Sequence, residues 1–366
     1  MPPPIALGVR RLHSHPQFLL PLSIYSTRPY SAKSHRRPSS SAQPPTSTRV
    51  PSTTSTATTS LPNDLNPPPS TRPADLNLPA ALPASADTST KLKRYIALGR
   101  AYLSFYKTGL KNVYHNYRAS IPLRRALGLP AYIPSSPPRN ADLAAAAAAD
   151  KPHAATGAAS VFKAKVAAAQ LSRANLQLVR RAAYDLRRMI PFTLILIICG
   201  EMTPLVILAL GNAVTPLTCR VPGQIAKARR KRVVEKRAAL AAQTGSVSDP
   251  GMAAEVALLR GLSRAEWVER ASVEEVMRAC AVFGIGGKRR VNVLAPVYRA
   301  RLRRYVEYLE VDDGLIRGCG GVGAMEAAEV TIAVEERGGV GVAEGLEGWD
   351  AEREERRWLE KWLHAA

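Results

Sequence analysis

The chain has 366 residues and a formal charge of +22, which allows one or two domains with tails and attracts polyanions. Its four cysteines form no CxxC pair and its six histidines show no metal spacing, which argues against a disulfide framework or a zinc site. The charge is uneven, with 18 basic and 3 acidic side chains in residues 91–189 but 17 and 21 in residues 238–366. A basic excess does not by itself distinguish between nucleic acid and anionic lipid as the partner. It is also compatible with a mitochondrial matrix protein of high pI that binds neither.

The N-terminus has the composition of a mitochondrial presequence. Residues 1–43 are rich in Arg, Ser and Pro and contain no acidic residue. The sequence around Arg28 and Tyr30 resembles the arginine-containing cleavage sites of the matrix processing peptidase, so we predict a presequence over residues 1–30. A secretory signal is disfavoured because the apolar run Phe18–Leu22 is short and is interrupted by Pro21. The remaining alternative is a disordered basic tail.

Two linkers and two helices follow. Residues 31–90 are rich in Pro, Ser and Thr, and we predict that they are disordered because they bury too little apolar surface. Residues 91–129 are predicted to form an amphipathic helix rich in aromatic residues. A second linker, rich in Pro and Ala, is expected over residues 130–160, and a basic helix over residues 161–189.

The main apolar stretch runs from Ile190 to Leu210, where 15 of 21 residues are apolar. About 20 such residues cross a bilayer as a helix. Basic clusters bound the stretch on both sides, as expected for anchors at anionic headgroups. The clusters are Arg180, Arg181, Arg187 and Arg188 before it, and Arg220 and Lys227 to Arg232 after it. These flanks favour a transmembrane helix over a buried core helix.

Three residues distinguish this stretch. Pro191 fits the first turn of a membrane helix, and Pro204 is expected to kink it. Glu201 lies near the middle, where a charged carboxylate costs roughly 2.5–3.5 kcal/mol, so it should be protonated, paired or facing a protein or water interior. One interpretation is a role in proton or cation movement. The other is a neutral carboxyl that hydrogen-bonds a partner helix.

These residues resemble the mitochondrial leucine-zipper and EF-hand-containing transmembrane (LETM-type) family. The resemblance consists of a Leu-Ser-Arg helix start at Leu171, an Asp185-Leu pair, Pro191-Phe192 at the membrane edge, an intramembrane glutamate followed by proline, and a Pro-x-Thr exit at Pro216. Downstream, the order of helices and turns up to the final Trp-Leu helix is similar to the ribosome-binding domain of that family, which is likened to the 14-3-3 proteins. The motifs quoted there include an acidic turn at Asp312-Asp313, a Gly-Gly-Val turn and an Arg-Gly turn. No EF-hand loop or sustained heptad segment is present in the chain.

The C-terminal region also has local helix signals. Ser272 to Glu275 is a capping-box sequence, and Gly284 is a plausible C-terminal stop. Asp350 is expected to cap the last helix. Helical spacing places several apolar residues on shared faces, and core packing is the expected role of the two tryptophans. These residues are Val273, Val276, Met277 and Cys280, then Leu302, Tyr305, Val306 and Leu309, then Trp358, Leu359, Trp362 and Leu363.

Motifs for enzyme chemistry are weak. The GxGxxG match at Gly318–Gly323 has no strand before it and no βαβ context, so we do not interpret it as a nucleotide site. The Gly284–Lys288 loop has Arg289 where a phosphate loop needs Ser or Thr. No catalytic set of Ser, His, Cys or Asp stands out, so the chain is not expected to be an enzyme and no cofactor or small-molecule substrate is predicted.

The sequence therefore predicts an all-α protein with a disordered N-terminus, a single transmembrane helix at 190–210 and a helical LETM-type ribosome-binding domain at 211–366. Candidate site residues are the membrane motif of Pro191, Phe192, Glu201, Pro204 and Pro216, and a basic collar of Lys227, Arg229, Arg230, Lys231 and Arg232. The collar is expected to contact ribosomal RNA or anionic lipid.

The resemblance implies a single-pass protein of the mitochondrial inner membrane that binds mitochondrial ribosomes and supports membrane-protein biogenesis and ion homeostasis. The bias of Lys and Arg near the stretch favours a C-terminal domain in the matrix. The alternative is a component of a potassium/proton exchanger that depends on Glu201. That alternative requires a homo-oligomer or another partner, because a single span cannot form a pore.

Overall fold

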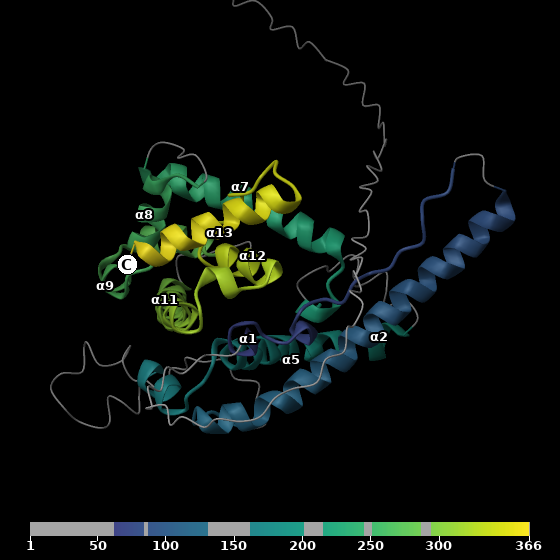
Figure 1. Ribbon diagram of the computed structural model, residues 1–366, viewed down its shortest axis with the longest axis horizontal. Helices are drawn as coiled ribbons and strands as arrows, with labels where there is room; N and C mark the ends of the chain where they lie inside the picture. The colour runs from purple at the N-terminus through teal and green to yellow at the C-terminus, as the bar shows by residue number, and fades with distance from the viewer. Residues whose placement is uncertain are drawn as a thin grey trace, which may run out of the picture. The chain divides into compact units, whose positions relative to one another are not determined.

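The computed structural model describes residues 62–83, 87–130, 162–200, 215–244, 251–286 and 294–365 (Figure 1). Within these ranges the regular structure is helical and contains no strand, which confirms the all-α prediction at the level of fold class. The predicted presequence and nearly all of the 130–160 linker lie outside the described residues. The helices are α1 (Pro62–Leu65), η1 (Pro69–Thr71), α2 (Thr88–Ala126), α5 (Arg173–Cys199), η4 (Leu217–Cys219), α7 (Pro222–Thr244), α8 (Ala253–Leu262), α9 (Ala265–Arg270), α10 (Val273–Val282), α11 (Ala295–Gly318), η6 (Val322–Ala324), α12 (Ala327–Glu336) and α13 (Gly348–His364).

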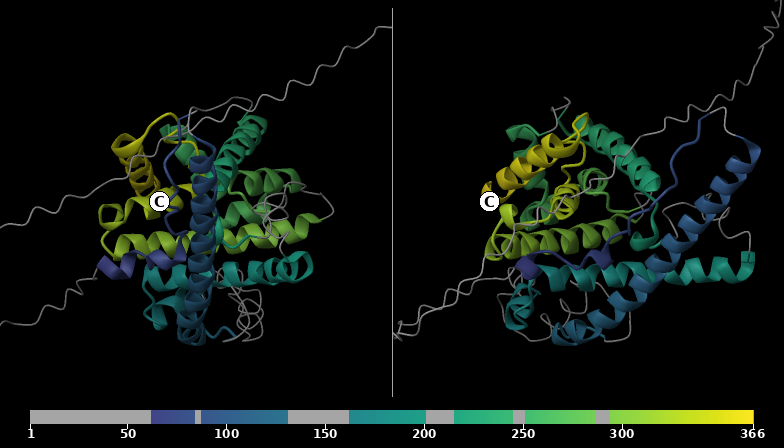
Figure 2. Two further views of the ribbon diagram at one scale, coloured as in Figure 1. Left: turned by 90° about the vertical axis from the view of Figure 1, so that its right-hand side faces the viewer. Right: turned by 45° about the vertical axis from the view of Figure 1, so that its right-hand side comes forward.

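Helix α2 matches the amphipathic helix predicted over residues 91–129. The Asp87 side chain caps its first turn by accepting a hydrogen bond from the Ser89 backbone N–H at 3.1 Å. The C-terminal part of α2 packs along α5 and η4, whereas no residue from Asp87 to Ser104 is buried. Figure 2 shows this N-terminal part as a helix that extends away from its neighbours.

Helix α5 runs without interruption from Arg173 to Cys199, so it joins the predicted basic helix to the first half of the predicted membrane helix. It ends at Gly200, whose φ of 50° is in the left-handed region that terminates helices. Pro191 is therefore in the interior of a helix, not in its first turn as predicted. In the part of the chain that the structure describes, no helix is both long and apolar enough to cross a membrane, and the second half of the predicted span, residues 201–214, lies outside that part.

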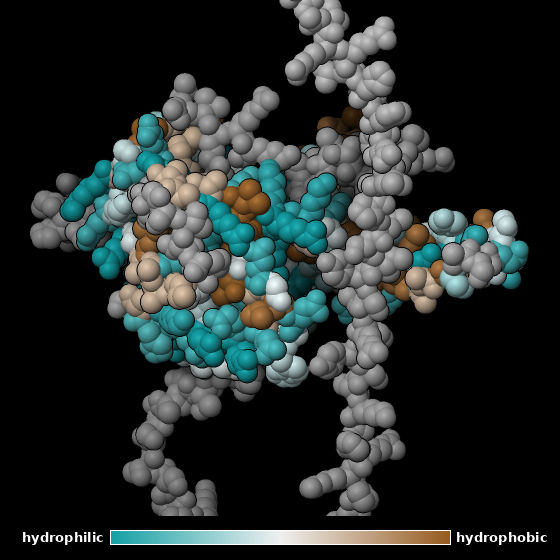
Figure 3. All heavy atoms as spheres, turned by 90° about the horizontal axis from the view of Figure 1, so that it is seen from above, coloured by the Kyte–Doolittle hydropathy of each residue, from teal (hydrophilic) through white to brown (hydrophobic). Residues whose placement is uncertain are grey.

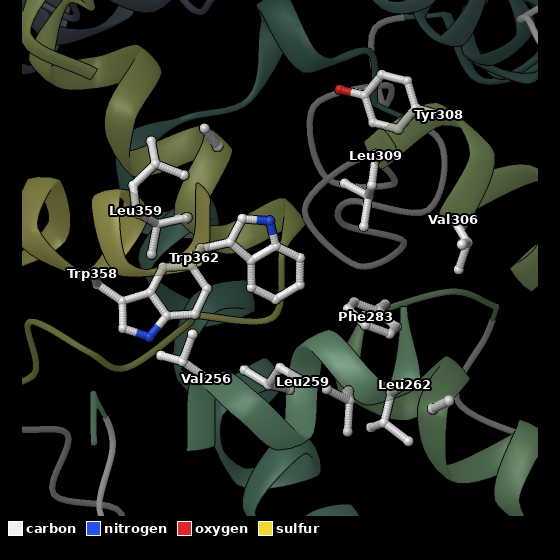
Figure 4. Packing of buried hydrophobic residues seen from close by; sticks show 14 of the residues in the cluster. Val256, Leu259, Leu262, Phe283, Val306, Tyr308, Leu309, Trp358, Leu359 and Trp362 are labelled. Carbon is white, nitrogen blue, oxygen red and sulfur yellow. The ribbon is translucent and has the colours of Figure 1, made fainter. Parts of the chain in front are cut away.

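The C-terminal helices share one apolar core. The rings of Trp358 and Trp362 on α13 stack with their centroids 5.6 Å apart, and neither side chain is exposed (Figure 4). They pack over Val256 and Leu259 of α8, while Leu309 and other residues of α11 line the same core. Core packing of the tryptophans is confirmed. A smaller apolar cluster joins α2, the helical segment 162–168, α5 and α11 through Leu127, Phe162, Leu176, Val179 and Val311.

The local helix signals were read correctly at α10 and wrongly at α13. At α10 the Ser272 hydroxyl accepts a hydrogen bond from the Glu275 N–H, and the Glu275 carboxylate accepts one from the Ser272 N–H, so the capping box is present. Gly284, with φ of 68°, ends the same helix in a Schellman arrangement in which the Ile285 N–H donates to the Cys280 carbonyl. By contrast, α13 begins at Gly348, and Asp350 is inside its first turn as the partner of Arg353.

Residues 62–83 were predicted to belong to a disordered linker, and this prediction is wrong. Leu65 is fully buried, and its carbonyl accepts a hydrogen bond from the Arg173 guanidinium at 3.1 Å. The Asn66 side chain bonds both the Ala324 carbonyl and the Glu326 N–H. Polar contacts to distant residues hold the segment in place, and a composition analysis that counts apolar surface cannot detect them.

Candidate functional site: a buried ion network, a junction between two flanks and a basic helix

A buried carboxylate on α11 joins α5 to the C-terminal helices. The Asp312 carboxylate accepts hydrogen bonds from Arg173 at 3.1 Å, Gln177 at 2.8 Å and Arg337 at 2.7 Å, and none of these four side chains is exposed. Burial alone would raise the pKa of Asp312, but Arg173 and Arg337 hold this pKa well below its usual range. The carboxylate is therefore ionised and fully compensated.

The neighbouring Asp313 extends the network toward α8 and α13. Its carboxylate pairs with Arg337 at 2.6 Å and Arg260 at 3.0 Å, and it accepts a hydrogen bond from the Trp362 indole N–H at 3.0 Å. The sequence predicted an acidic turn at Asp312-Asp313. Both residues are instead inside helix α11, because arginines from three other elements neutralise them in the interior.

A second buried carboxylate joins α5 to α12. The Glu329 side chain is completely buried and forms a bidentate pair with Arg181, with both N–O distances at 2.8 Å. Arg181 also donates to the Thr71 hydroxyl at 3.2 Å, which ties η1 to the same pair. Arg180, the preceding residue, pairs with Glu336 and lies over the Tyr308 ring at 3.5 Å from its centroid. Arg180 and Arg181 were predicted to anchor headgroups, but they face the C-terminal helices.

The two ends of the apolar stretch meet at a junction formed by α5, η4 and α2. The Asp185 carboxylate accepts a hydrogen bond from the Leu217 N–H at 2.6 Å, and the Thr218 hydroxyl donates to the Gly109 carbonyl at 3.3 Å. Arg220 donates to the Tyr184 hydroxyl at 2.5 Å. Burial raises the pKa of Asp185 to about 6, although the Leu217 N–H and Arg220 favour its charged form.

The structure describes only some of the residues of the predicted membrane motif. Phe192 is buried on α5, and Pro216 is the buried residue that precedes η4, so both lie at the ends of the stretch next to the junction. Glu201 and Pro204 lie outside the described residues.

The predicted basic collar forms the first half of α7, and its residues differ in role. Arg229 and Arg232 pair with Glu335 of α12, and Lys231 pairs with Glu235 one turn along the same helix. Within the described ranges, Lys227 and Arg230 are exposed and have no carboxylate within ion-pair distance. Lys227 and Arg230 are therefore the collar residues that remain open to a phosphate.

Two helix segments expose apolar side chains to solvent. Figure 3 shows apolar and hydrophilic residues side by side on the projecting end of α2. The exposed side chains on α2 follow helical spacing, and the basic residues Lys93, Arg100 and Lys107 run beside them in a helix that contains no acidic residue. The exposed residues are Leu92, Tyr95, Ile96 and Leu103 on α2, and Ile190, Leu194, Ile197 and Ile198 at the end of α5.

Metal binding has little support in the described ranges. No group of three or more His, Cys, Asp or Glu side chains is placed there to hold a metal ion, and the buried carboxylates of Asp312 and Glu329 are paired with arginines. Comparison with known proteins found no matching family model, no matching curated protein and no matching solved structure. The geometry of the described residues and the sequence therefore carry the functional argument.

The sequence analysis missed the buried network. Its signal was present in α5, where Arg173, Gln177, Arg181 and Asp185 recur at four-residue intervals and so share one helix face. Residues 161–189 were predicted only as a basic helix, and Arg181 as a headgroup anchor, so the partners of this face were not predicted. A polar face on a helix whose other residues are mainly apolar indicates partners of opposite charge elsewhere in the fold.

The network generates a stability prediction. Replacing Asp312 with Asn removes one of the two carboxylates that each of Arg173 and Arg337 contacts, so we expect a loss of about 3 kcal/mol in the free energy of unfolding, the low end for a broken buried pair. Asp350→Asn is the matched control, because Asp350 forms an exposed pair with Arg353 and should change stability by less than about 0.5 kcal/mol. Chemical denaturation of the detergent-solubilised protein measures both. Equal effects of the two substitutions would contradict the assigned role of Asp312.

The junction generates a pH prediction. Because the pKa of Asp185 is about 6 in the folded protein and 3.8 in its unperturbed state, the folded state holds this proton more tightly, and stability falls as pH rises from about 4 to about 6. Asp185→Asn removes this contribution. Over that pH interval, we expect the free energy of unfolding of the variant to rise by up to about 3 kcal/mol relative to that of the wild type. Thermal unfolding at pH 4 and pH 7 measures the difference, and an identical difference at the two pH values would contradict the prediction.

Proposed function

We propose that this protein is attached to the mitochondrial inner membrane and binds mitochondrial ribosomes through helix α7. The single observation that carries the proposal is that Lys227 and Arg230 are exposed on α7 while their basic neighbours are held by carboxylates of the same fold. A helix fixed in this way presents two cations at a defined position. Phosphate neutralisation by such cations supplies affinity for RNA that does not depend on sequence.

Membrane attachment is supported by the exposed apolar residues of α2 and α5. Ile197 and Ile198 at the end of α5 are 75% and 72% exposed, which is costly in water and favourable in lipid. The apolar residues of α2 lie beside a row of basic residues, an arrangement that fits the interface of an anionic bilayer. The presequence composition and the resemblance to the LETM-type family support a mitochondrial location for this membrane. The same resemblance supports a 14-3-3-like ribosome-binding domain over residues 211–366.

The ribosome proposal predicts that the exposed cations of α7 contribute to ribosome binding and that exposed cations on α9 do not. The double substitution Lys227→Glu and Arg230→Glu should weaken binding to purified mitochondrial ribosomes at least about tenfold and reduce its salt dependence by about two phosphate contacts. Arg264→Glu and Arg270→Glu is the matched control, because these residues are equally exposed but lie at the two ends of α9. Co-sedimentation in detergent without added lipid measures ribosome binding alone.

The result that overturns the proposal is unchanged ribosome binding by the α7 variant, or an equal loss in both variants. Deleting residues 238–366 would be a poor substitute, because it removes Asp312 and Glu329 and leaves buried arginines of α5 without their partners. Point substitutions at exposed positions leave this network intact.

A further inference from the structure

The junction constrains how the apolar segment can enter a membrane. Asp185 lies five residues before the predicted span, and Leu217 follows it, yet the Asp185 carboxylate and the Leu217 N–H are 2.6 Å apart. Two further hydrogen bonds stabilise the same junction, one from the Thr218 hydroxyl to the Gly109 carbonyl and one from Arg220 to the Tyr184 hydroxyl. The chain therefore leaves this junction after Asp185 and returns to it by Leu217.

A straight helix through the predicted span cannot satisfy this junction. Continued from Asp185 to Leu210 at 1.5 Å per residue, α5 would be about 37 Å long. The roughly seven residues from Leu210 to Leu217 reach at most about 25 Å when fully extended. Leu217 would therefore remain at least about 12 Å from Asp185, whereas the two residues are in hydrogen-bond contact.

The end of α5 supplies the reversal that the junction requires. The helix stops at Cys199, and Gly200 has a φ of 50°, a conformation that ends helices and redirects the chain. From Asp185 to Cys199 the helix rises about 21 Å, and the roughly 18 residues between Cys199 and Leu217 cover the same distance with ease. From Ile190 to Cys199 the rise is about 14 Å, close to half of the ~30 Å hydrocarbon core.

We infer that the two described flanks of the apolar segment lie at the same face of the membrane, so that α2 and the helices α7 to α13 are on one side of the bilayer. The inference rests on the proposed membrane attachment and replaces the single crossing expected from the sequence. The buried network requires the same arrangement, because Arg173 and Arg181 of α5 are paired with Asp312 and Glu329. Exposed isoleucines at the end of α5 then insert into one leaflet, and the basic row of α2 lies at its surface.

A disulfide between the two flanks tests this arrangement. A Cβ atom built on Gly109 of α2 lies 2.7 Å from the Cys219 sulfur, so a cysteine at position 109 is close enough for an S–S bond of about 2.05 Å. Gly99→Cys is the matched control, because it lies on the same helix and has nothing within 4 Å. Intact mitochondria carrying each variant are treated with a copper–phenanthroline oxidant, and the linked peptides are identified by mass spectrometry before and after reduction. Carbonate extraction of the same samples reports membrane attachment separately.

We expect a reducible link to Cys219 in Gly109→Cys but not in Gly99→Cys, with both proteins resistant to carbonate. Carbonate-resistant Gly109→Cys protein that forms no link overturns the same-face arrangement and leaves membrane attachment standing. Carbonate-soluble wild-type protein overturns both the attachment and this inference, whether or not the link forms.

Because Thr218 also lies within 3 Å of the added Cβ, a second measurement guards against a misfolded variant. Ala119→Cys on α2 and Glu360→Cys on α13 are exposed substitutions that leave the junction and the basic row of α2 unchanged. Each is made in a background with Cys199 and Cys319 replaced by Ser and is labelled in mitoplasts with a membrane-impermeant maleimide. Equal labelling, or equal protection that detergent removes, supports one face. Labelling of one position and protection of the other overturns it.

Discussion

The interaction between Arg173, Asp312 and Arg337 is the constraint on which the rest of the described structure depends. A single carboxylate, completely buried, is shared by guanidinium groups from α5 and from the end of α12. Removing Asp312 takes one of two carboxylate partners from each buried guanidinium group, because Arg173 keeps only Glu329 at 3.6 Å and Arg337 keeps only Asp313 at 2.6 Å. Losing a buried counter-charge costs more than an exposed pair contributes. The backbone of α1 and the side chain of Gln177 satisfy further donors and acceptors of the same group. The network therefore fixes which helices are neighbours as well as how firmly they pack.

One consequence is that the segments before and after the apolar stretch form one folded unit. Helix α5 is bound to α11 and α12 by Asp312 and Glu329, and η4 is bound to α5 by Asp185. The exposed apolar end of α5 and the exposed cations of α7 are then parts of the same packed body. Under the proposed membrane attachment, this packing holds the basic surface at a fixed distance from the bilayer, as the proposed ribosome binding requires.

The sequence predicted the parts of the fold that depend on local rules. The capping box at Ser272, the stop at Gly284 and the apolar face with Trp358 and Trp362 follow from short-range chemistry and helical spacing, and all are confirmed. One local prediction failed, the cap at Asp350, because α13 already begins at Gly348. The other failures depend on residues far apart in the chain. Asp312-Asp313 was predicted to be a turn from the motif order of the family that the chain resembles, and residues 62–83 were predicted to be disordered because they are poor in apolar residues.

The candidate site shows the same difference between what local sequence predicts and what contacts between distant residues decide. The collar was found from its charge run, but only the structure separates exposed Lys227 and Arg230 from Arg229 and Arg232, which are paired with Glu335 on another helix. The membrane motif was found from hydropathy, which measures length and composition but carries no information on where the chain returns. The contact between Asp185 and Leu217 supplies that information, since a hydrogen bond between the two flanks limits every path between them.

Native-state hydrogen exchange, followed by mass spectrometry on the detergent-solubilised protein, tests the central claim most directly. If the buried network makes one unit of the two flanks, amides in the middle of α5 and in α11 open together and show the same protection. Exchange in α5 that is about 100-fold faster or more than in α11 would contradict the account, because it would show that α5 separates from the C-terminal helices while they remain folded.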